Sequence, residues 1–286
     1  MSVTTILSVQ SSVAYGHVGN CAAVFPLQRI GVEVWPVNTV HFSNHTGYGQ
    51  WRGPVLPTQD VKDVITGVAE RGALPTIDAV LSGYQGGEEI GGVILDAVAQ
   101  VKEANPEAIY ACDPVMGNAK SGCFVHPAIP VLLRDSVVPR ADLITPNQFE
   151  LGFLTETDPH TLDETLASVQ MARDMGPGTV LVTSLLRPDA PPDTIEMLAA
   201  DGDEAWIVQT PHLPLKANGS GDVTAALFTA HHLETGRLDT ALARTVSSMF
   251  DILQTTLDSG QRELQLVQSQ EAIALPRMQF QVTQVS

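Results

Sequence analysis

Residues 79–112 have the sequence AVLSGYQGGEEIGGVILDAVAQVKEANPEAIYAC. An apolar run at 79–81 is followed by an amphipathic stretch over 88–104 and by a second apolar run at 109–112. Short apolar runs bounded by turn residues are typical of buried strands. The stretch between them has the length that a right-handed crossover helix needs. Residues 79–112 therefore predict two parallel strands joined by a helix.

The same alternation extends in both directions along the chain. Further apolar, β-branched runs occur at 5–9, 32–37, 143–145 and 179–183, and further amphipathic stretches at 59–71 and 162–175. Strands and helices that alternate in this way favour an α/β fold with a doubly wound, mostly parallel central sheet flanked by helices.

The pattern changes after residue 183. Two short apolar runs, 194–200 and 205–208, flank Asp201-Gly202-Asp203, which is typical of a hairpin turn. We therefore expect the sheet to end in an antiparallel edge. Helical patterns then follow at 222–233, 238–256 and 263–274.

The composition limits the classes of partner. A chain of 286 residues with 44% hydrophobic residues fits one domain over 1–286. It has 32 Asp and Glu against 15 Lys and Arg, and the formal net charge of -17 repels nucleic acid and anionic membranes, so we expect neither as a partner. The few scattered cysteines, the lack of a basic amino-terminal region and the lack of a long apolar run favour a cytoplasmic location.

A glycine-rich turn precedes the first of the late helices, in the segment Asn218-Gly219-Ser220-Gly221-Asp222. Glycines allow successive backbone N–H groups to turn toward one point, and a helix N-terminus adds partial positive charge there. Such a turn can stabilise a phosphate or a developing oxyanion, and Asp222 beside it can accept a proton from a substrate hydroxyl. The alternative is that the segment only caps the helix.

Polar residues also follow two of the predicted strands. Asp113 comes directly after the run at 109–112, and Asn147 and Glu150 follow the run at 143–145. In an open α/β sheet the carboxyl ends of the strands form the edge where ligands bind. Hard oxygen ligands on such loops suit Mg²⁺, which bridges to substrate phosphates. For Glu150 the alternative is a capping role in the first turn of a helix.

Taken in this order, these segments resemble the ribokinase-like superfamily and, within it, the pyridoxal kinases. The resemblance covers nearly the whole chain. It is carried by SVQSSVAYGHVGN at 8–20, WPVNTVHFSNHTGYG at 35–49, LSGY at 81–84 and DPVMG at 113–117.

The resemblance implies transfer of the γ-phosphate of MgATP to the 5′-hydroxyl of pyridoxal, and of the related vitamers pyridoxine and pyridoxamine. By the same resemblance, Asp222 is the catalytic base, and the amides from Gly219 through Ser220 to Gly221 form the anion hole. The implied substrate-binding residues are Ser11, His45, Thr46, Gly47 and Tyr84, together with Asp222.

The resemblance also implies a nucleotide site and a metal site. The implied ATP-binding residues are Asp113, Thr145, Asn147, Glu150, Thr183, Thr210, Pro211, His212 and Leu213. Asp113 and Glu150 are the implied magnesium ligands, a monovalent cation is a further candidate, and a homodimer is the implied assembly.

Two positions depart from the bacterial members of this family, which often carry His and Lys where this chain has Ser12 and Thr183. Thr183-Ser184 is more similar to the eukaryotic relatives. Two other functions stay open: a hydroxymethylpyrimidine kinase of the same superfamily, and a non-catalytic homologue that binds B6 or a nucleotide. Ser11 with residues 12–20 argues against the first, and Asp222 behind two glycines argues against the second.

Overall fold

The structure is a computed structural model that describes residues 3–286. Its main sheet has nine strands. They are β1 (Thr5–Tyr15), β2 (Glu33–Asn44), β3 (Ala79–Ser82), β4 (Ile109–Cys112), β7 (Leu143–Ile144), β8 (Thr179–Leu185), β9 (Thr194–Asp201), β10 (Glu204–Pro211) and β11 (Val282–Gln284). A separate hairpin is formed by β5 (Gly117–Asn118) and β6 (Gly122–Cys123).

The strands of the main sheet follow the order β11-β10-β9-β8-β7-β4-β3-β1-β2. The strands from β8 to β2 pair in parallel, whereas β9 is antiparallel to both β8 and β10. The doubly wound sheet with an antiparallel edge is thus confirmed. One strand of this main sheet was not predicted: β11 pairs with β10 in antiparallel fashion and forms the outermost edge. The short hairpin of β5 and β6 was not predicted either.

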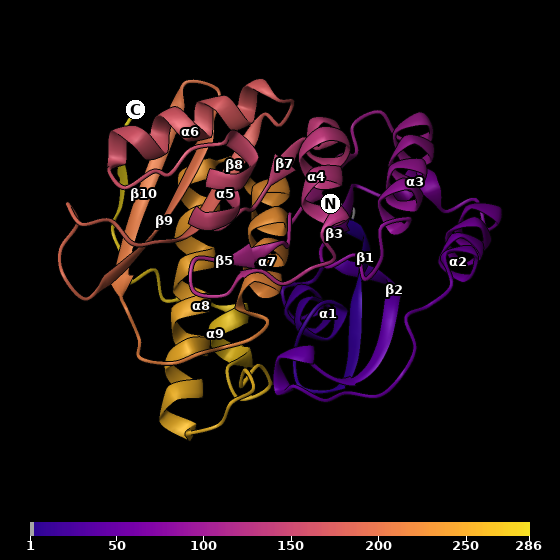
Figure 1. Ribbon diagram of the computed structural model, residues 1–286, viewed down its shortest axis with the longest axis horizontal. Coiled ribbons are helices and arrows are strands. Elements are labelled where there is room, and N and C mark those ends of the chain that lie inside the picture. The colour runs from indigo at the N-terminus through magenta and orange to yellow at the C-terminus, as the bar shows by residue number, and fades with distance from the viewer. Residues whose placement is uncertain (1–2) are drawn as a thin grey trace.

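Helices cover both faces of this sheet (Figure 1). They are α1 (Asn20–Arg29), α2 (Thr58–Glu70), α3 (Ile90–Ala104), α4 (Ala128–Leu132), α5 (Gln148–Thr155), α6 (Leu162–Asp174), α7 (Ser220–Thr235), α8 (Leu238–Ser259) and α9 (Gln270–Ala274). Helices α2 to α6 pack in one apolar core, and α1, α7 and α8 pack in the other.

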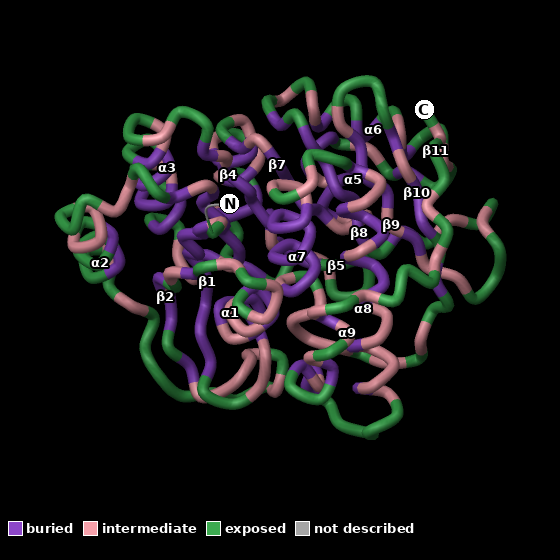
Figure 2. The backbone as a smooth tube through the Cα atoms, turned by 180° about the vertical axis from the view of Figure 1, so that it is seen from behind, coloured by how far each residue is buried: buried purple, intermediate pink, exposed green. Residues whose placement is uncertain are grey.

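Alternate residues of each strand point into these two cores. In β1, Leu7 belongs to the core under α2 to α6, and its neighbour Ile6 belongs to the core under α1, α7 and α8. Figure 2 shows that buried backbone concentrates in the central strands and in α7, whereas α2 lies at the periphery. Because both faces are covered, the central strands β3 and β4 are buried along nearly their whole length.

The first two strands run beyond the ends that the sequence predicts. β1 and β2 stay paired as far as Tyr15 and Asn44, with an irregularity of register between Gln10 and Ser12. This extension carries the segments 8–20 and 35–49 past the edge of the sheet. Ser11 lies within the irregular stretch and is buried.

The helix predicted over 263–274 is wrong for most of its length, because only α9 (Gln270–Ala274) is helical. Helix α8 ends at Gly260, which has the left-handed φ of 63° that favours glycine. Beyond it the chain turns, and the Gln265 amide donates to the Thr256 hydroxyl at 3.1 Å. Glu263 therefore lies outside any helix, and its side chain accepts hydrogen bonds from His17 and Tyr48 in the amino-terminal part of the chain.

Candidate active site

The glycine-rich turn lies where α7 begins. Gly219 precedes the helix with φ 86°, and a Cβ atom there would overlap the carbonyl oxygen of His17. Glycine is therefore required both by the backbone conformation and by the close approach of the loop after β1. The turn brings the start of α7 against the segment at 8–20.

Asp222 lies in the first turn of α7 and is only partly accessible. Burial raises its pKa to about 6, although hydrogen bonding from the Gly19 backbone acts in the opposite direction. A carboxylate with a pKa just below neutrality is ionised at pH 7 and still basic enough to accept a proton from a hydroxyl group.

Asp113 faces the glycine-rich turn from the end of β4. A Cβ atom on Gly221 would lie 3.9 Å from Asp113 Oδ2, and the Thr145 hydroxyl donates to Asp113 Oδ1 at 3.1 Å. Burial, followed by the negative charges of Glu150 and Asp222, raises the pKa of Asp113 well above its usual range. Glu150 and Asp222 thus lie close enough to disfavour the ionised form of Asp113.

Glu150 caps α5, as the alternative reading of its sequence position proposed. Its carboxylate accepts from the Met116 amide at 2.9 Å, from the Gly117 amide at 3.3 Å and from the Asn147 amide at 2.9 Å. The Asn147 side chain completes the capping box and donates to the Gly117 carbonyl oxygen at 2.9 Å. Burial raises the pKa of Glu150 to about 7, while the amide hydrogen bonds lower it.

The donor set suits a hard divalent cation that is shared with a phosphate. Within residues 3–286, no three His, Cys, Asp or Glu side chains are grouped so that they could hold a metal ion unaided. Asp113 is buried beside two other carboxylates with no salt-bridge partner among the described residues. An Mg²⁺ ion here would relieve that repulsion and would take its other ligands from phosphate oxygens and water.

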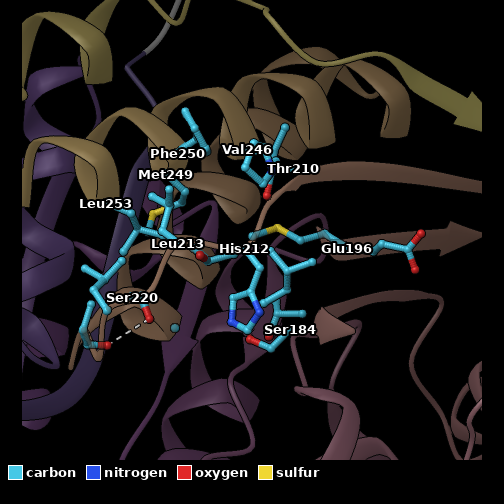
Figure 3. A pocket seen from close by; sticks show the side chains of 18 of the residues that line it. Ser184, Glu196, Thr210, His212, Leu213, Ser220, Val246, Met249, Phe250 and Leu253 are labelled. Carbon is cyan, nitrogen blue, oxygen red and sulfur yellow. Dashed lines mark hydrogen bonds between the residues drawn. The ribbon is translucent and has the colours of Figure 1, made fainter. Parts of the chain in front are cut away.

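A cavity of about 430 Å³ adjoins the glycine-rich turn. Its lining includes seven of the residues implicated by sequence, namely Thr183, Thr210, Pro211, His212, Leu213, Ser220 and Gly221. Figure 3 shows Ser220 at one end of the cavity and Thr210 and Glu196 farther along. The dashed line in that view is the hydrogen bond from Ser220 Oγ to the Ala217 carbonyl oxygen, 3.2 Å.

The opposite wall of the cavity was missed by sequence analysis. It is an apolar stripe on α8, made by Val246, Met249, Phe250 and Leu253 (Figure 3). Their spacing of three and four residues is the same as that of an ordinary core-facing helix, so the sequence carried no separate signal. Lys216, in the loop before α7, also lines the cavity.

The strand edge of the cavity is held by an ion pair. Arg187 donates to the Glu196 carboxylate at 2.6 Å and 3.1 Å, and the exposed fractions of the two side chains are 7% and 0%. Between Thr183 and this pair, Ser184 has a left-handed φ of 55° at an irregularity in β8. The ion pair fixes the start of β9 next to the end of β8.

The residues expected around the pyridine ring lie outside the cavity lining. Ser11 is buried in β1 against Gly19, where a Cβ atom would overlap the Ser11 backbone and hydroxyl. Tyr84 follows β3, and its carbonyl oxygen accepts from the Thr39 hydroxyl at 3.2 Å. The Gly19 backbone also donates a hydrogen bond to Asp222, so the loop after β1 lies beside the start of α7.

His45, Thr46 and Gly47 lie in the loop that leads into the short helix η1 (Thr46–Tyr48), where His45 Nδ1 accepts from the Gly47 amide at 3.0 Å. Burial lowers the pKa of His45, Glu263 opposes this effect, and Arg262 and Lys216 add to it.

The sequence is similar to pyridoxal kinases over its whole length. It is 71% identical over 280 residues to the pyridoxal kinase PdxY of Leifsonia xyli subsp. xyli, covering 98% of this chain and 99% of that protein. The pyridoxal kinase PdxY of Corynebacterium diphtheriae is 62% identical over 281 residues, with coverage of 98% and 99%.

Two further comparisons cover the fold and a broader family. The pyridoxal kinase of Leishmania donovani in complex with ADP and pyridoxamine superposes with a TM-score of 0.92 at 27% identity, covering 99% of this chain and 100% of that one. The profile of the phosphomethylpyrimidine kinase family matches residues 75–266. Among residues 3–286, no helix has the length and apolar character needed to cross a membrane.

Proposed function

The chain belongs to the pyridoxal kinase PdxY family, and we propose that it transfers the γ-phosphate of ATP to the 5′-hydroxyl of pyridoxal. The observation that supports this proposal most directly is the position of Asp222. This base lies behind the glycine-rich turn, with the buried Asp113 on one side and the cavity of about 430 Å³ adjoining it. Phosphoryl transfer needs mainly this: two substrates held in line, a base, and neutralisation of phosphate charge.

In the proposed reaction, Asp222 accepts the proton of the 5′-hydroxyl while the hydroxyl oxygen forms a bond to the γ-phosphorus. The bond between that phosphorus and the β,γ-bridging oxygen breaks, and ADP leaves with the electron pair. Amides of Gly219, Ser220 and Gly221 stabilise charge on the transferred phosphoryl group. Ser11, His45, Thr46, Gly47 and Tyr84 orient the vitamer.

The nucleotide is proposed to occupy the cavity. The α8 stripe of Val246, Met249, Phe250 and Leu253 offers an apolar surface for the base, and Thr183 and Lys216 offer polar contacts toward the phosphates. Asp113 and Glu150, with Thr145 and Asn147 supporting them, would hold Mg²⁺. When bound, that ion supplies positive charge beside the β- and γ-phosphates.

Glu150 enters this scheme mainly as a positioning residue. Its oxygens already accept three amide hydrogen bonds, so the lone pairs left for a metal or its water shell are few. Within residues 3–286, the Asp113 carboxylate accepts only the hydrogen bond from the Thr145 hydroxyl, and it is the better candidate for direct contact with the ion.

A hydroxymethylpyrimidine kinase is the second candidate. The family profile that points to it matches residues 75–266, a range that begins after the segments with Ser11 and His45. Those amino-terminal segments belong instead to the near-complete match with the pyridoxal kinases. A non-catalytic binder is opposed by Asp222, since binding alone needs no base beside an anion hole.

A coupled kinase assay tests the proposal with pyridoxal, pyridoxine, pyridoxamine and hydroxymethylpyrimidine, each with and without Mg²⁺. We expect Mg²⁺-dependent turnover with pyridoxal as a good substrate. Dominant activity on the pyrimidine would reject the substrate assignment, and no turnover of any compound would support the binder. The same assay in K⁺ and in Na⁺ tests the use of a monovalent cation.

Three broader features belong to the same proposal. Family resemblance supports a homodimer, and sedimentation as a monomer at micromolar concentration would contradict it. The continuous sheet supports a single domain over 1–286, for which one cooperative unfolding transition is expected. Net charge and cysteine content support a cytoplasmic location, which fractionation of cells can test.

A further inference from the structure

Two residues beyond the end of α8 contact both amino-terminal loops of the substrate side. Glu263 is buried and uses both carboxylate oxygens: Oε1 accepts from the Tyr48 hydroxyl at 2.5 Å, and Oε2 accepts from the His17 amide at 3.1 Å. Its neighbour Arg262 donates to the Gly47 carbonyl oxygen at 3.0 Å. We call Arg262 and Glu263 the 262–263 clasp.

The residues around the clasp pack closely against its two side chains. The guanidinium of Arg262 lies 3.7 Å from the centre of the Tyr48 ring, within the range of a cation–π interaction. Gly16 has φ 94°, and a Cβ atom on it would overlap the Glu263 carboxylate. Tyr15 packs edge-on against Tyr48, with ring centres 6.2 Å apart.

Apart from the clasp, local hydrogen bonds hold the loop: the Asn44 side-chain amide donates to the carbonyl oxygens of His45 and Gln50, at 3.1 Å and 2.9 Å. None of the residues of η1 (Thr46–Tyr48) is buried, so core packing does not fix it. Glu263 meets Tyr48 across 215 residues of sequence, and Arg262 meets Gly47 across the same separation. Hydrogen bonds to a buried carboxylate are among the stronger polar contacts in proteins.

We propose that Arg262 and Glu263 are positioning residues, which hold the loop of His45, Thr46 and Gly47 and the loop of His17 in the arrangement that binds the vitamer. The proposal rests on the proposed function, because it assigns those loops to the pyridoxal side. Neither residue of the clasp lines the nucleotide cavity. Its loss therefore affects binding of the vitamer and leaves binding of ATP unchanged.

The test uses Tyr48→Phe and Glu263→Gln in the full chain. Phenylalanine keeps the ring under Arg262 and removes the hydroxyl donor, whereas glutamine keeps the shape and removes the charge. We expect each variant to raise the KM for pyridoxal about tenfold, the order of one hydrogen bond to a charged group, with the KM for ATP within about twofold of wild type. The double variant should raise it by less than the product of the two effects, since both weaken one hydrogen bond.

A second measurement needs no substrate. Amide hydrogen exchange over residues 44–49 should be faster in both variants, because the loop loses its anchor. The matched control is Glu271→Gln, which alters a carboxylate with 78% exposure that pairs with Arg29. It should leave both KM values and the exchange of 44–49 unchanged.

The outcomes separate the clasp from the kinase function. An unchanged KM for pyridoxal together with unchanged exchange over 44–49 would overturn the clasp, and so would an equal rise in both KM values. A wild-type enzyme without pyridoxal turnover would reject the proposed function, and the exchange measurement would still decide whether the clasp holds the loop.

Discussion

The Thr145 hydroxyl donates a 3.1 Å hydrogen bond to the buried carboxylate of Asp113. The two residues follow neighbouring parallel strands, β7 and β4, whose register pairs Cys112 with Ile144. Burial and the charges of Glu150 and Asp222 raise the pKa of Asp113, and this hydrogen bond lowers it. The bond therefore lowers the pKa of the carboxylate that we propose as a magnesium ligand.

Replacing this threonine tests that relationship. Thr145→Val keeps the shape of the side chain and removes the donor, so protonated Asp113 becomes more favoured and Mg²⁺ binds less well. We expect the Mg²⁺ concentration for half-maximal rate to rise about tenfold, as for loss of one hydrogen bond to a charged group. Magnesium titration at saturating ATP measures it. Thr66→Val, on the exposed face of α2, should leave the titration unchanged.

The role of Asp222 as a base predicts a loss of turnover without a loss of nucleotide. Asp222→Asn keeps the size of the side chain and cannot accept the hydroxyl proton, so kcat should fall about a hundredfold or more. The dissociation constant for ATP, measured by calorimetry, should stay within about threefold of wild type. A variant that turns over at the wild-type rate would remove Asp222 from the mechanism.

The pKa of Asp222 predicts an acid limb in the pH profile. Burial raises that pKa to about 6, and the base is useful only when it is deprotonated. As the pH falls below about 6, kcat/KM for pyridoxal should therefore drop about tenfold per unit. Measurements between pH 5 and 8 check this, with correction for ionisation of the vitamer itself. A limb near the ordinary aspartate value of about 4 would contradict the buried environment.

The ion pair at the cavity edge predicts a stability effect. Arg187→Met leaves the fully buried Glu196 carboxylate with only Gln209 as a side-chain partner, and breaking a buried pair on one side costs about 3–5 kcal/mol. Denaturant unfolding should show that loss. Arg187→Met combined with Glu196→Met should recover much of it, because no unpaired charge remains.

A surface pair provides the control for that experiment. Arg237 pairs with Asp239, and its side chain is 67% exposed. Arg237→Met should change the free energy of unfolding little, since exposed ion pairs are screened by water and salt. Equal losses for Arg187→Met and Arg237→Met would show that burial of the first pair does not matter.

Local sequence patterns predicted most of the fold and the residues at the centre of the proposed site. The alternation in residues 79–112 predicted β3, α3 and β4, because burial on both faces makes a parallel strand apolar throughout and a covering helix amphipathic. Asp113, Asn147 and Gly219 were found because strand ends and helix starts leave signals within a few residues. Their convergence at one edge follows from parallel pairing.

Other features depend on contacts between distant parts of the chain. The α8 wall of the cavity has the spacing of any core helix, and Met249 is itself buried in an apolar core while it also lines the cavity with Leu213. The sequence predicted a helix at Glu263, and that helix does not form. The role of Glu263 could not be found from local patterns, because its hydrogen-bond partner Tyr48 is 215 positions away. Periodicity reports which side of an element is apolar, whereas the partner of a polar side chain is set by where the backbone brings the two together.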